Sequence, residues 1–441
     1  MQQLIATSAP KSPKSLNLFK RPSRDSLLHS FVLADQALVS GSNFLLGVLL
    51  TRKLPLDQVG QYWLLMAVVF FGGTIQLALI VSPMMSVGPL QDRWSAREYL
   101  VGVTVQEYAF VFAYSIIALG VLCSLRLIGL HIASGVIIPL LCANAAYLLQ
   151  DFYRRALFFQ KKAMLGFFSD TISYLGQIAI LWFLLTRTQL SLPSILWISA
   201  ATSTVALLLV VFKLPIARCG TDTLKAIAIR NWASGRYLLG AAVLQWCSGS
   251  LFGLVAPAFL GAAVAGIMRA CQSLVNATNI WVQGLENSLP SQASERYRAG
   301  GPVALKAYLV RAETLLVGGT LGLALAVIVA PKFWLQLLYG HRLDGYGFLL
   351  QAYAILAVFS VAGLPIRAGL RAIERTKPVF VGYVVSTIFS AIAAPLVPGL
   401  FGLKGVSVAL IFTQVLTLPI LAISLRRGLN KTRAWNAKAT R

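Results

Sequence analysis

Charged residues are scarce in this sequence of 441 amino acids, where they make up 12% of the positions. Soluble domains carry roughly 25% charged residues, so a water-soluble globular protein is excluded. Acidic residues are the scarcest, with 14 Asp and Glu against 38 Lys and Arg. The basic residues stand singly between apolar runs, and this scattered pattern predicts no nucleic-acid partner.

Residues typical of reactive sites are also few. The five Cys and three His are scattered, so the sequence predicts neither a disulfide framework nor a metal site. It has no Gly-x-x-x-x-Gly-Lys-Ser/Thr phosphate loop, and no long polar segment separates its apolar ones. These absences argue against an ATP-driven pump, a membrane glycosyltransferase and a polymerase with a large periplasmic loop. We therefore expect a protein that is not an enzyme and that binds no cofactor.

Apolar residues dominate the rest of the chain, with 57% hydrophobic positions and a mean hydropathy of +0.75. A bilayer core is about 30 Å thick, and a helix needs roughly 20 apolar residues to cross it. Apolar windows bounded by charges, Gly and Pro predict an all-α integral membrane protein with about twelve such helices. Their predicted ranges are 30–50, 61–84, 99–123, 127–150, 164–186, 192–213, 237–259, 262–289, 308–330, 346–369, 378–400 and 403–424.

The distribution of Lys and Arg predicts the topology. An even number of crossings puts both termini on one side, and the tails and loops of that side hold most of the 38 basic residues. Positive residues mark cytoplasmic loops, so we expect both termini in the cytoplasm. The first apolar segment contains Asp35 and lacks a small-residue cleavage site, which predicts an uncleaved signal anchor.

The predicted helices fall into two sets of six that echo each other. Ser40-Gly41-Ser42 recurs as Ser248-Gly249-Ser250, and Glu107 recurs as Glu313 at nearly the same separation. Repeats with an even number of helices run parallel, and transporters built this way place the substrate path between them. We therefore expect two six-helix lobes around a central cavity. The predicted division is 1–28 (basic cytoplasmic tail), 29–213 (N-lobe), 214–236 (basic cytoplasmic linker), 237–424 (C-lobe) and 425–441 (basic cytoplasmic tail).

A row of polar residues runs along the predicted helix 262–289. Its members are Arg269, Gln272, Asn276, Asn279, Gln283 and Glu286. The spacing alternates between three and four residues, which keeps the side chains within an arc of about 100° over a length of roughly 26 Å. Because polar groups are costly in lipid, the row predicts one wall of a water-filled, substrate-binding lumen. A hydrogen-bonded seam between two helices is the alternative.

Arg269 is the basic residue of this row. A guanidinium stays charged and can bind a phosphate through two hydrogen bonds, so Arg269 is a candidate ligand for a phosphate group. It also lies near one end of its predicted helix, and the alternative is that its side chain reaches out to the membrane interface.

Several carboxylates fall inside predicted helices. The candidate ion-coupling residues are Asp35, Glu107, Asp170 and Glu313. A buried carboxylate can exchange a proton with a gradient across the membrane, which is the functional interpretation. The alternative is that Asp35 and Asp170 simply pair with a basic residue. The candidates for such a partner are Arg154, Arg155 and Lys161.

Short motifs along the chain resemble those of bacterial polysaccharide flippases, a family of the multidrug/oligosaccharidyl-lipid/polysaccharide exporter superfamily. The motifs are Ser40-Gly41-Ser42-Asn43-Phe44, Leu49-Leu50-Thr51-Arg52-Lys53-Leu54, Val59-Gly60-Gln61-Tyr62, Arg154-Arg155-Ala156-Leu157-Phe158-Phe159-Gln160 and the segments 266–274 and 285–290. Pro55 departs from the family, which usually has a small residue there.

This resemblance implies a bacterial inner-membrane exporter that works by alternating access. Its substrate would be an undecaprenyl-pyrophosphate-linked oligosaccharide, moved from the cytoplasmic to the periplasmic leaflet for O-antigen or exopolysaccharide synthesis. H⁺ or Na⁺ would drive transport, and polysaccharide polymerase and export proteins would be partners. Two alternatives are a cation-coupled multidrug exporter of the same superfamily and a non-transporting scaffold of a polysaccharide synthase. Arg269 argues against export of organic cations, and a scaffold would need no continuous polar row.

Overall fold

The computed structural model describes residues 24–86, 88, 94–127, 134–188, 190–214, 219–278 and 280–439. All regular secondary structure in these ranges is helical, as the sequence predicts. The N-terminal half contains α1 (Arg24–Lys53), α2 (Leu56–Gln76), η1 (Leu77–Val81), α3 (Ser82–Ser86), α4 (Ala96–Leu127), η3 (Ser134–Val136), α5 (Ile137–Phe159), α6 (Ala163–Asp170), η4 (Thr171–Leu175), α7 (Gly176–Arg187) and α8 (Leu192–Val211). The C-terminal half contains α9 (Thr221–Leu260), α10 (Ala263–Thr278), α11 (Ile280–Val329), α12 (Pro331–Tyr339), η5 (Gly340–Tyr346), α13 (Gly347–Ala372) and α14 (Lys377–Ala439).

The two longest helices each contain a reversal at glycine. Gly301 has φ 62° in α11, and Gly402 has φ 59° in α14, a backbone conformation that glycine adopts without a steric penalty. Each of these helices therefore contributes two passes. When α10 and the first part of α11 are counted as one interrupted pass, the described residues form twelve helical passes, which confirms the predicted number. Nine continuous segments among the described residues are long and apolar enough to cross a membrane, and Lys377–Asn430 contains two of the predicted helices.

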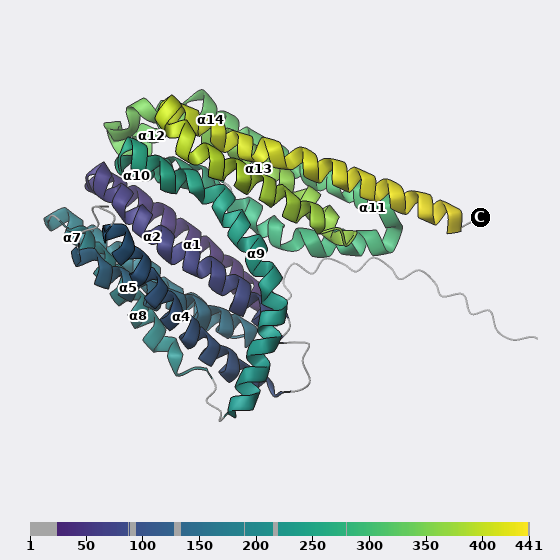
Figure 1. The fold of residues 1–441 in the computed structure, drawn as a ribbon, viewed down its shortest axis with the longest axis horizontal. Coiled ribbons are helices and arrows are strands. Elements are labelled where there is room, and N and C mark those ends of the chain that lie inside the picture. The colour runs from purple at the N-terminus through teal and green to yellow at the C-terminus, as the bar shows by residue number, and fades with distance from the viewer. Residues whose placement is uncertain are drawn as a thin grey trace, which may run out of the picture.

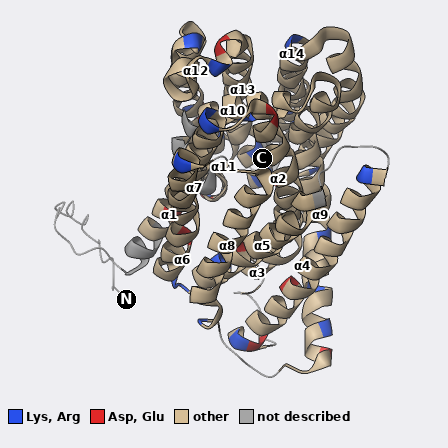
Figure 2. Cartoon of the chain, turned by 90° about the vertical axis from the view of Figure 1, so that its left-hand side faces the viewer, with Lys and Arg blue, Asp and Glu red and all other residues tan. Residues whose placement is uncertain are grey.

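Each half of the chain forms a lobe with its own apolar core. Leu50, Leu140 and Leu196 are fully buried in the first lobe, and Cys271 and Leu350 are fully buried in the second. The outward faces of the helices carry exposed Leu, Ile, Val and Phe side chains, which suits a surface in contact with lipid. Figure 2 shows Lys, Arg, Asp and Glu mostly toward the ends of the helices, with other residues over most of their length.

Helix α9 connects the two lobes, and the boundary between them lies inside this helix. The predicted linker 214–236 is helical from Thr221 onward. Ile227 is buried in a core cluster of the first lobe. Asn231 accepts a hydrogen bond from the Tyr99 hydroxyl at 3.0 Å and donates one to Gln106 Oε1 at 2.9 Å. The N-terminal part of α9 is thus packed on the first lobe and its C-terminal part on the second.

The lobes meet at one end of the molecule and diverge toward the other (Figure 1). The meeting end, here named the closed end, is formed by the α1–α2 turn, the start of α10, α12 and η5. The helices α2 and α10 pack so tightly there that a Cβ atom on Gly60 would overlap the carbonyl oxygen of Ala262. The backbone N–H of Ala263 donates to Asp57 Oδ1 at 3.2 Å.

Two arginines also link the lobes at the closed end. Arg52, at the end of α1, donates from Nη2 to the carbonyl oxygen of Leu337 at 2.6 Å and from Nε to that of Leu338. Arg342 in η5 donates from Nη1 to the carbonyl oxygen of Thr51 at 2.5 Å. The carbonyl groups at the end of a helix lack partners within the helix, so each arginine satisfies a helix end of the opposite lobe.

Candidate functional site

A pocket with a volume of about 140 Å³ lies between the two lobes, next to the closed end. It is lined by α2 from the first lobe and by α9, α10, α13 and α14 from the second. The lining residues are Trp63, Leu64, Ala67, Phe70, Trp246, Gly249, Ser250, Gly253, Leu254, Ala265, Met268, Arg269, Gln272, Tyr353 and Leu410. This set contains four large aromatic side chains, one cation and no carboxylate.

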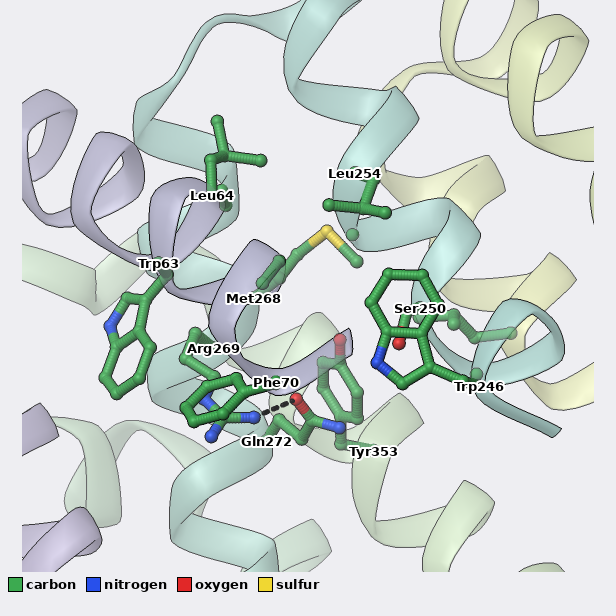
Figure 3. A pocket seen from close by; sticks show the side chains of 15 residues that line it. Trp63, Leu64, Phe70, Trp246, Ser250, Leu254, Met268, Arg269, Gln272 and Tyr353 are labelled. Atoms are coloured by element: carbon green, nitrogen blue, oxygen red, sulfur yellow. Dashed lines mark hydrogen bonds between the residues drawn. The ribbon is translucent and has the colours of Figure 1, made fainter. Parts of the chain in front are cut away.

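Arg269 is the charged group of this pocket. Its guanidinium carbon lies 4.7 Å from the ring centre of Trp63 and 5.7 Å from that of Phe70. Its Nη1 donates to Gln272 Oε1 at 3.2 Å, while its Nε–H is buried without a hydrogen-bond partner among the residues that the structure describes. Figure 3 shows Arg269, Gln272 and the two rings together on one side of the pocket. Arg269 therefore points between the lobes and not out to the membrane interface.

The structure describes only part of the predicted polar row. Arg269 and Gln272 line the pocket, and Asn276 is exposed near the end of α10. The helix α10 ends at Thr278 and α11 begins at Ile280. Asn279 and the side chains of Gln283 and Glu286 lie outside the described residues. A lumen wall along the full row remains a prediction.

A second polar site lies inside the first lobe, around Arg154 of α5. Its Nη1 is 2.8 Å from Asp170 Oδ2 and 3.3 Å from Asp35 Oδ2, and its Nη2 pairs with Asp151. Arg155 Nε is 2.7 Å from Asp151 Oδ2. Asp35 of α1 and Asp170 of α6 thus meet through one guanidinium, which is the pairing that the sequence offered as an alternative. We name Asp35, Asp151, Arg154, Arg155 and Asp170 the acidic cluster.

The acidic cluster contains three carboxylates and two guanidinium groups, so it has one negative charge in excess when all groups are ionised. Asp35 Oδ1 is buried and has no hydrogen-bond partner in the described part of the chain, whereas Asp170 also accepts a hydrogen bond from Gln150 Nε2 at 3.1 Å. Because burying an unpaired charge is costly, the cluster is suited to take up one monovalent cation or proton at Asp35.

The two remaining candidate carboxylates differ in their surroundings. Glu107 is fully buried and accepts a hydrogen bond from Gln76 Nε2 at 2.6 Å. The same Gln76 nitrogen donates to the carbonyl oxygen of Leu148 at 2.7 Å. Glu107 Oε2 and Gln76 Oε1 are both buried and have no hydrogen-bond partner among the described residues. Glu313 of α11 is only partly buried.

Both polar sites of the first lobe adjoin a π-helical turn. The turn η1 directly follows Gln76, and η4 directly follows Asp170. A π-turn inserts an extra residue into a helix and often occurs at a functional site. These turns change the register of the helix next to the buried polar groups.

Sequence reasoning missed several residues of these sites. Trp63 and Phe70 are hidden in an apolar run, although their spacing of seven residues places them on one helix face. Gln76 and Gln150 lie inside predicted helices, where a buried amide needs a partner. A search for amides within apolar runs finds the two glutamines, but not the carboxylates that they contact.

The comparisons with known proteins agree with this architecture. The family model MatE matches residues 238–396, which lie in α9 to α14. An inward-facing multidrug resistance MATE family transporter of the MOP superfamily superposes with a TM-score of 0.76 at 12% identity, over 90% of this chain and 96% of that chain. An outward-facing one gives a TM-score of 0.63 at 13% identity, over 96% of this chain and 100% of that chain.

A lipid II flippase, MurJ, in an inward closed conformation superposes with a TM-score of 0.66 at 13% identity, over 92% of this chain and 89% of that chain. No curated protein matches the chain by sequence. Identities this low show the fold and leave the substrate open. The chain is therefore a multi-pass membrane protein with the twelve-helix fold of MATE transporters.

Proposed function

We propose that this protein is a flippase that moves a polyprenyl-pyrophosphate-linked oligosaccharide across the bacterial inner membrane by alternating access. The observation that carries the proposal is Arg269, a cation in a pocket between the lobes whose lining includes no carboxylate. Buried charges in proteins are normally paired, so an unpaired guanidinium calls for an anionic ligand. The motifs of α1, α2 and α10 that resemble polysaccharide flippases support the same substrate class.

A diphosphate with an attached sugar matches the chemistry of this pocket. The guanidinium can bind phosphate oxygens through two charge-assisted hydrogen bonds. Aromatic faces such as Trp246 and Tyr353 and the hydroxyl of Ser250 suit the apolar faces and hydroxyl groups of a sugar ring. The polyprenyl tail needs no place in the pocket, because it can stay in the lipid beside the protein.

The contacts of the closed end support the direction of transport. Under the predicted topology the closed end faces the periplasm, and the lobes diverge on the side of the termini. The higher TM-score against an inward-facing relative agrees with that assignment. A headgroup that enters from the cytoplasm would therefore reach Arg269 at the end of its path.

The acidic cluster supplies the site for ion coupling in this proposal. One cation or proton at Asp35 would balance the charges of the cluster. A proton fits this place better than Na⁺, because Arg154 already contacts the carboxylates that a metal ion would need as oxygen ligands. Glu107 with Gln76 is a second place for a proton. Glu313 remains a weaker candidate, since it is only partly buried.

Export of organic cations is the second candidate function. It is favoured by the aromatic lining of Trp63, Phe70, Trp246 and Tyr353, because aromatic faces attract cations. Arg269 would repel such a substrate from the same pocket. The polysaccharide hypothesis explains both the aromatic rings and the cation, and we therefore prefer it.

The test is the sidedness of lipid-linked oligosaccharide in a strain without the gene. We expect the oligosaccharide to accumulate on the cytoplasmic leaflet and to leave it when the wild-type gene is restored. Arg269→Ala should restore at most about one hundredth of the flipping rate, and Arg269→Lys should restore part of it, because a lost charged contact costs about 3 kcal/mol. Arg311→Ala is the matched control, since Arg311 is exposed on α11 outside the pocket. Unchanged sidedness in the deletion strain would overturn the proposal.

A further inference from the structure

We propose that Trp63 and Phe70 are positioning residues of a diphosphate site whose donors come from Arg269. Because the rings belong to the first lobe and the guanidinium to the second, the site is complete only while the closed end is shut. Its affinity for the anion falls when α2 and α10 separate. This inference rests on the proposed function and adds the reason why the headgroup is bound on one side of the membrane and released on the other.

The contact between Arg269 and the rings crosses the boundary between the lobes. Trp63 and Phe70 lie on α2, two turns apart on one helix face, and Arg269 lies on α10. The two rings are nearly parallel, with an interplanar angle of 28° and centres 6.5 Å apart. Trp63 is buried at 7% exposure, so its ring has a fixed place against α10. The guanidinium is held by an aromatic surface that the opposite lobe supplies.

Stacking on aromatic faces leaves the edge of a guanidinium free. The N–H groups lie in the guanidinium plane, so contacts of the rings with its face do not use them. Gln272 takes one N–H of Nη1, and Nε–H is buried with no partner in the described part of the chain. Arg269 thus has unused donors of the kind that bind two phosphate oxygens, and no residue in the pocket lining carries a negative charge.

Opening of the closed end would dismantle this arrangement. The helices α2 and α10 pack tightly at Gly60 and Ala262, about one turn from Trp63 on α2 and two turns from Arg269 on α10. Separation of α2 from α10 at this contact carries Trp63 and Phe70 away from the guanidinium. Arg269 then regains a flexible side chain and access to water, and both changes weaken anion binding.

A ring contact also connects this site with α5, the helix that carries the arginines of the acidic cluster. Phe70 contacts Tyr147 edge to face, with ring centres 6.3 Å apart. Tyr147 lies on α5, the helix that carries Arg154. A change of charge in the cluster can therefore reach Phe70 through a shift of α5 and the Tyr147 ring, which gives ion uptake a route to the anion site.

The experiment measures the affinity of the purified full-length protein in lipid nanodiscs for inorganic pyrophosphate by calorimetry. We expect Trp63→Leu to weaken binding about tenfold and Phe70→Leu about threefold, since the Trp63 ring is closer and aromatic contacts to a desolvated cation are of this strength. Trp63→Phe should stay within about threefold of the wild type, because it keeps an aromatic face. Trp182→Leu is the control and should leave the affinity unchanged, because Trp182 is exposed on α7 and does not line the pocket.

Gly60→Leu tests whether the affinity for pyrophosphate depends on the contact between the lobes. If the rings had a purely structural role, this substitution would leave the affinity unchanged. It keeps both rings and Arg269 but forces α2 away from α10, so we expect a loss of about tenfold, similar to that of Trp63→Leu. Wild-type affinity in Trp63→Leu or in Gly60→Leu, with binding abolished in Arg269→Ala, would overturn the inference and leave the proposed function in place. Binding that does not depend on Arg269 would overturn both.

Discussion

The two lobes share a helical layout but use their charged residues differently. In the first lobe, Arg154 is paired with three carboxylates of the same lobe, all of them at most 13% exposed. In the second lobe, Arg269 has no acidic partner in its pocket and contacts two rings of the opposite lobe. A charge that is paired within one lobe does not depend on how the two lobes are arranged. A charge that is completed across the boundary depends on how the lobes are arranged.

The two repeated glutamates also have different surroundings in the two lobes. Glu107 and Glu313 occupy matching positions in the two halves of the sequence, yet Glu107 is fully buried beside Gln76 while Glu313 is partly exposed on α11. The repeat thus preserves the helices and not the environment of their side chains. In the proposed mechanism the two lobes accordingly have different tasks, with ion uptake in the first and recognition of the anionic headgroup mainly in the second.

Among the variants that test this difference between the lobes, Arg154→Ala should have the largest effect on stability. Removal of this guanidinium leaves three buried carboxylates with only Arg155 nearby, and we expect the free energy of unfolding to fall by about 3–5 kcal/mol. Arg269→Ala should lower it by less than about 1 kcal/mol, because no carboxylate in the pocket lining loses a partner. Thermal unfolding of the purified variants in one detergent checks the difference. Equal losses in the two variants would contradict the division of roles between the lobes.

The sequence predicted the fold well, because apolar runs of membrane length and their polar boundaries are local signals. It also indicated Arg269 and Gln272 as neighbours, since residues three apart share a helix face. It did not show that Asp35 of α1 and Asp170 of α6 meet at one guanidinium, because that contact depends on how three helices pack. The position of Trp63 opposite Arg269 was hidden for the same reason.

The division at 214–236 shows a further limit of the sequence. Basic residues indicate the side of the membrane on which a stretch lies, whether or not the stretch is helical. Charge alone therefore does not define where a lobe ends. The buried Ile227 and Asn231 assign the N-terminal part of α9 to the first lobe. Scattered apolar residues in a basic stretch are too weak a signal for such an assignment.

A smaller effect is expected within the acidic cluster itself. Asp151→Asn removes a carboxylate that contacts both arginines, and we expect it to lower the free energy of unfolding by about 1.5–3 kcal/mol. Asp35→Asn removes the excess negative charge too, but Asp35 contacts only Arg154, at 3.3 Å, so it should change stability little, while transport becomes insensitive to the proton gradient. Thermal unfolding and flipping rates with and without an imposed gradient test both statements. Gradient-driven transport by Asp35→Asn would show that the coupling ion binds elsewhere, with Glu107 as the next candidate.

The smallest effect concerns the closed end, where the lobes contact each other directly. Arg342→Ala removes one hydrogen bond between the lobes while leaving both interiors intact. We expect it to shift the equilibrium toward the open arrangement by about 1 kcal/mol, or roughly fivefold, without a change in thermal unfolding. Spin labels at the exposed positions Lys53 and Lys332, one in each lobe, report this shift as a larger population of long distances in a background without native cysteines. Arg126→Ala at the exposed end of α4 is the control and should leave the distances unchanged. An unchanged distribution in Arg342→Ala would mean that the packing of Gly60 against Ala262, and not the arginine, sets the balance between the two arrangements.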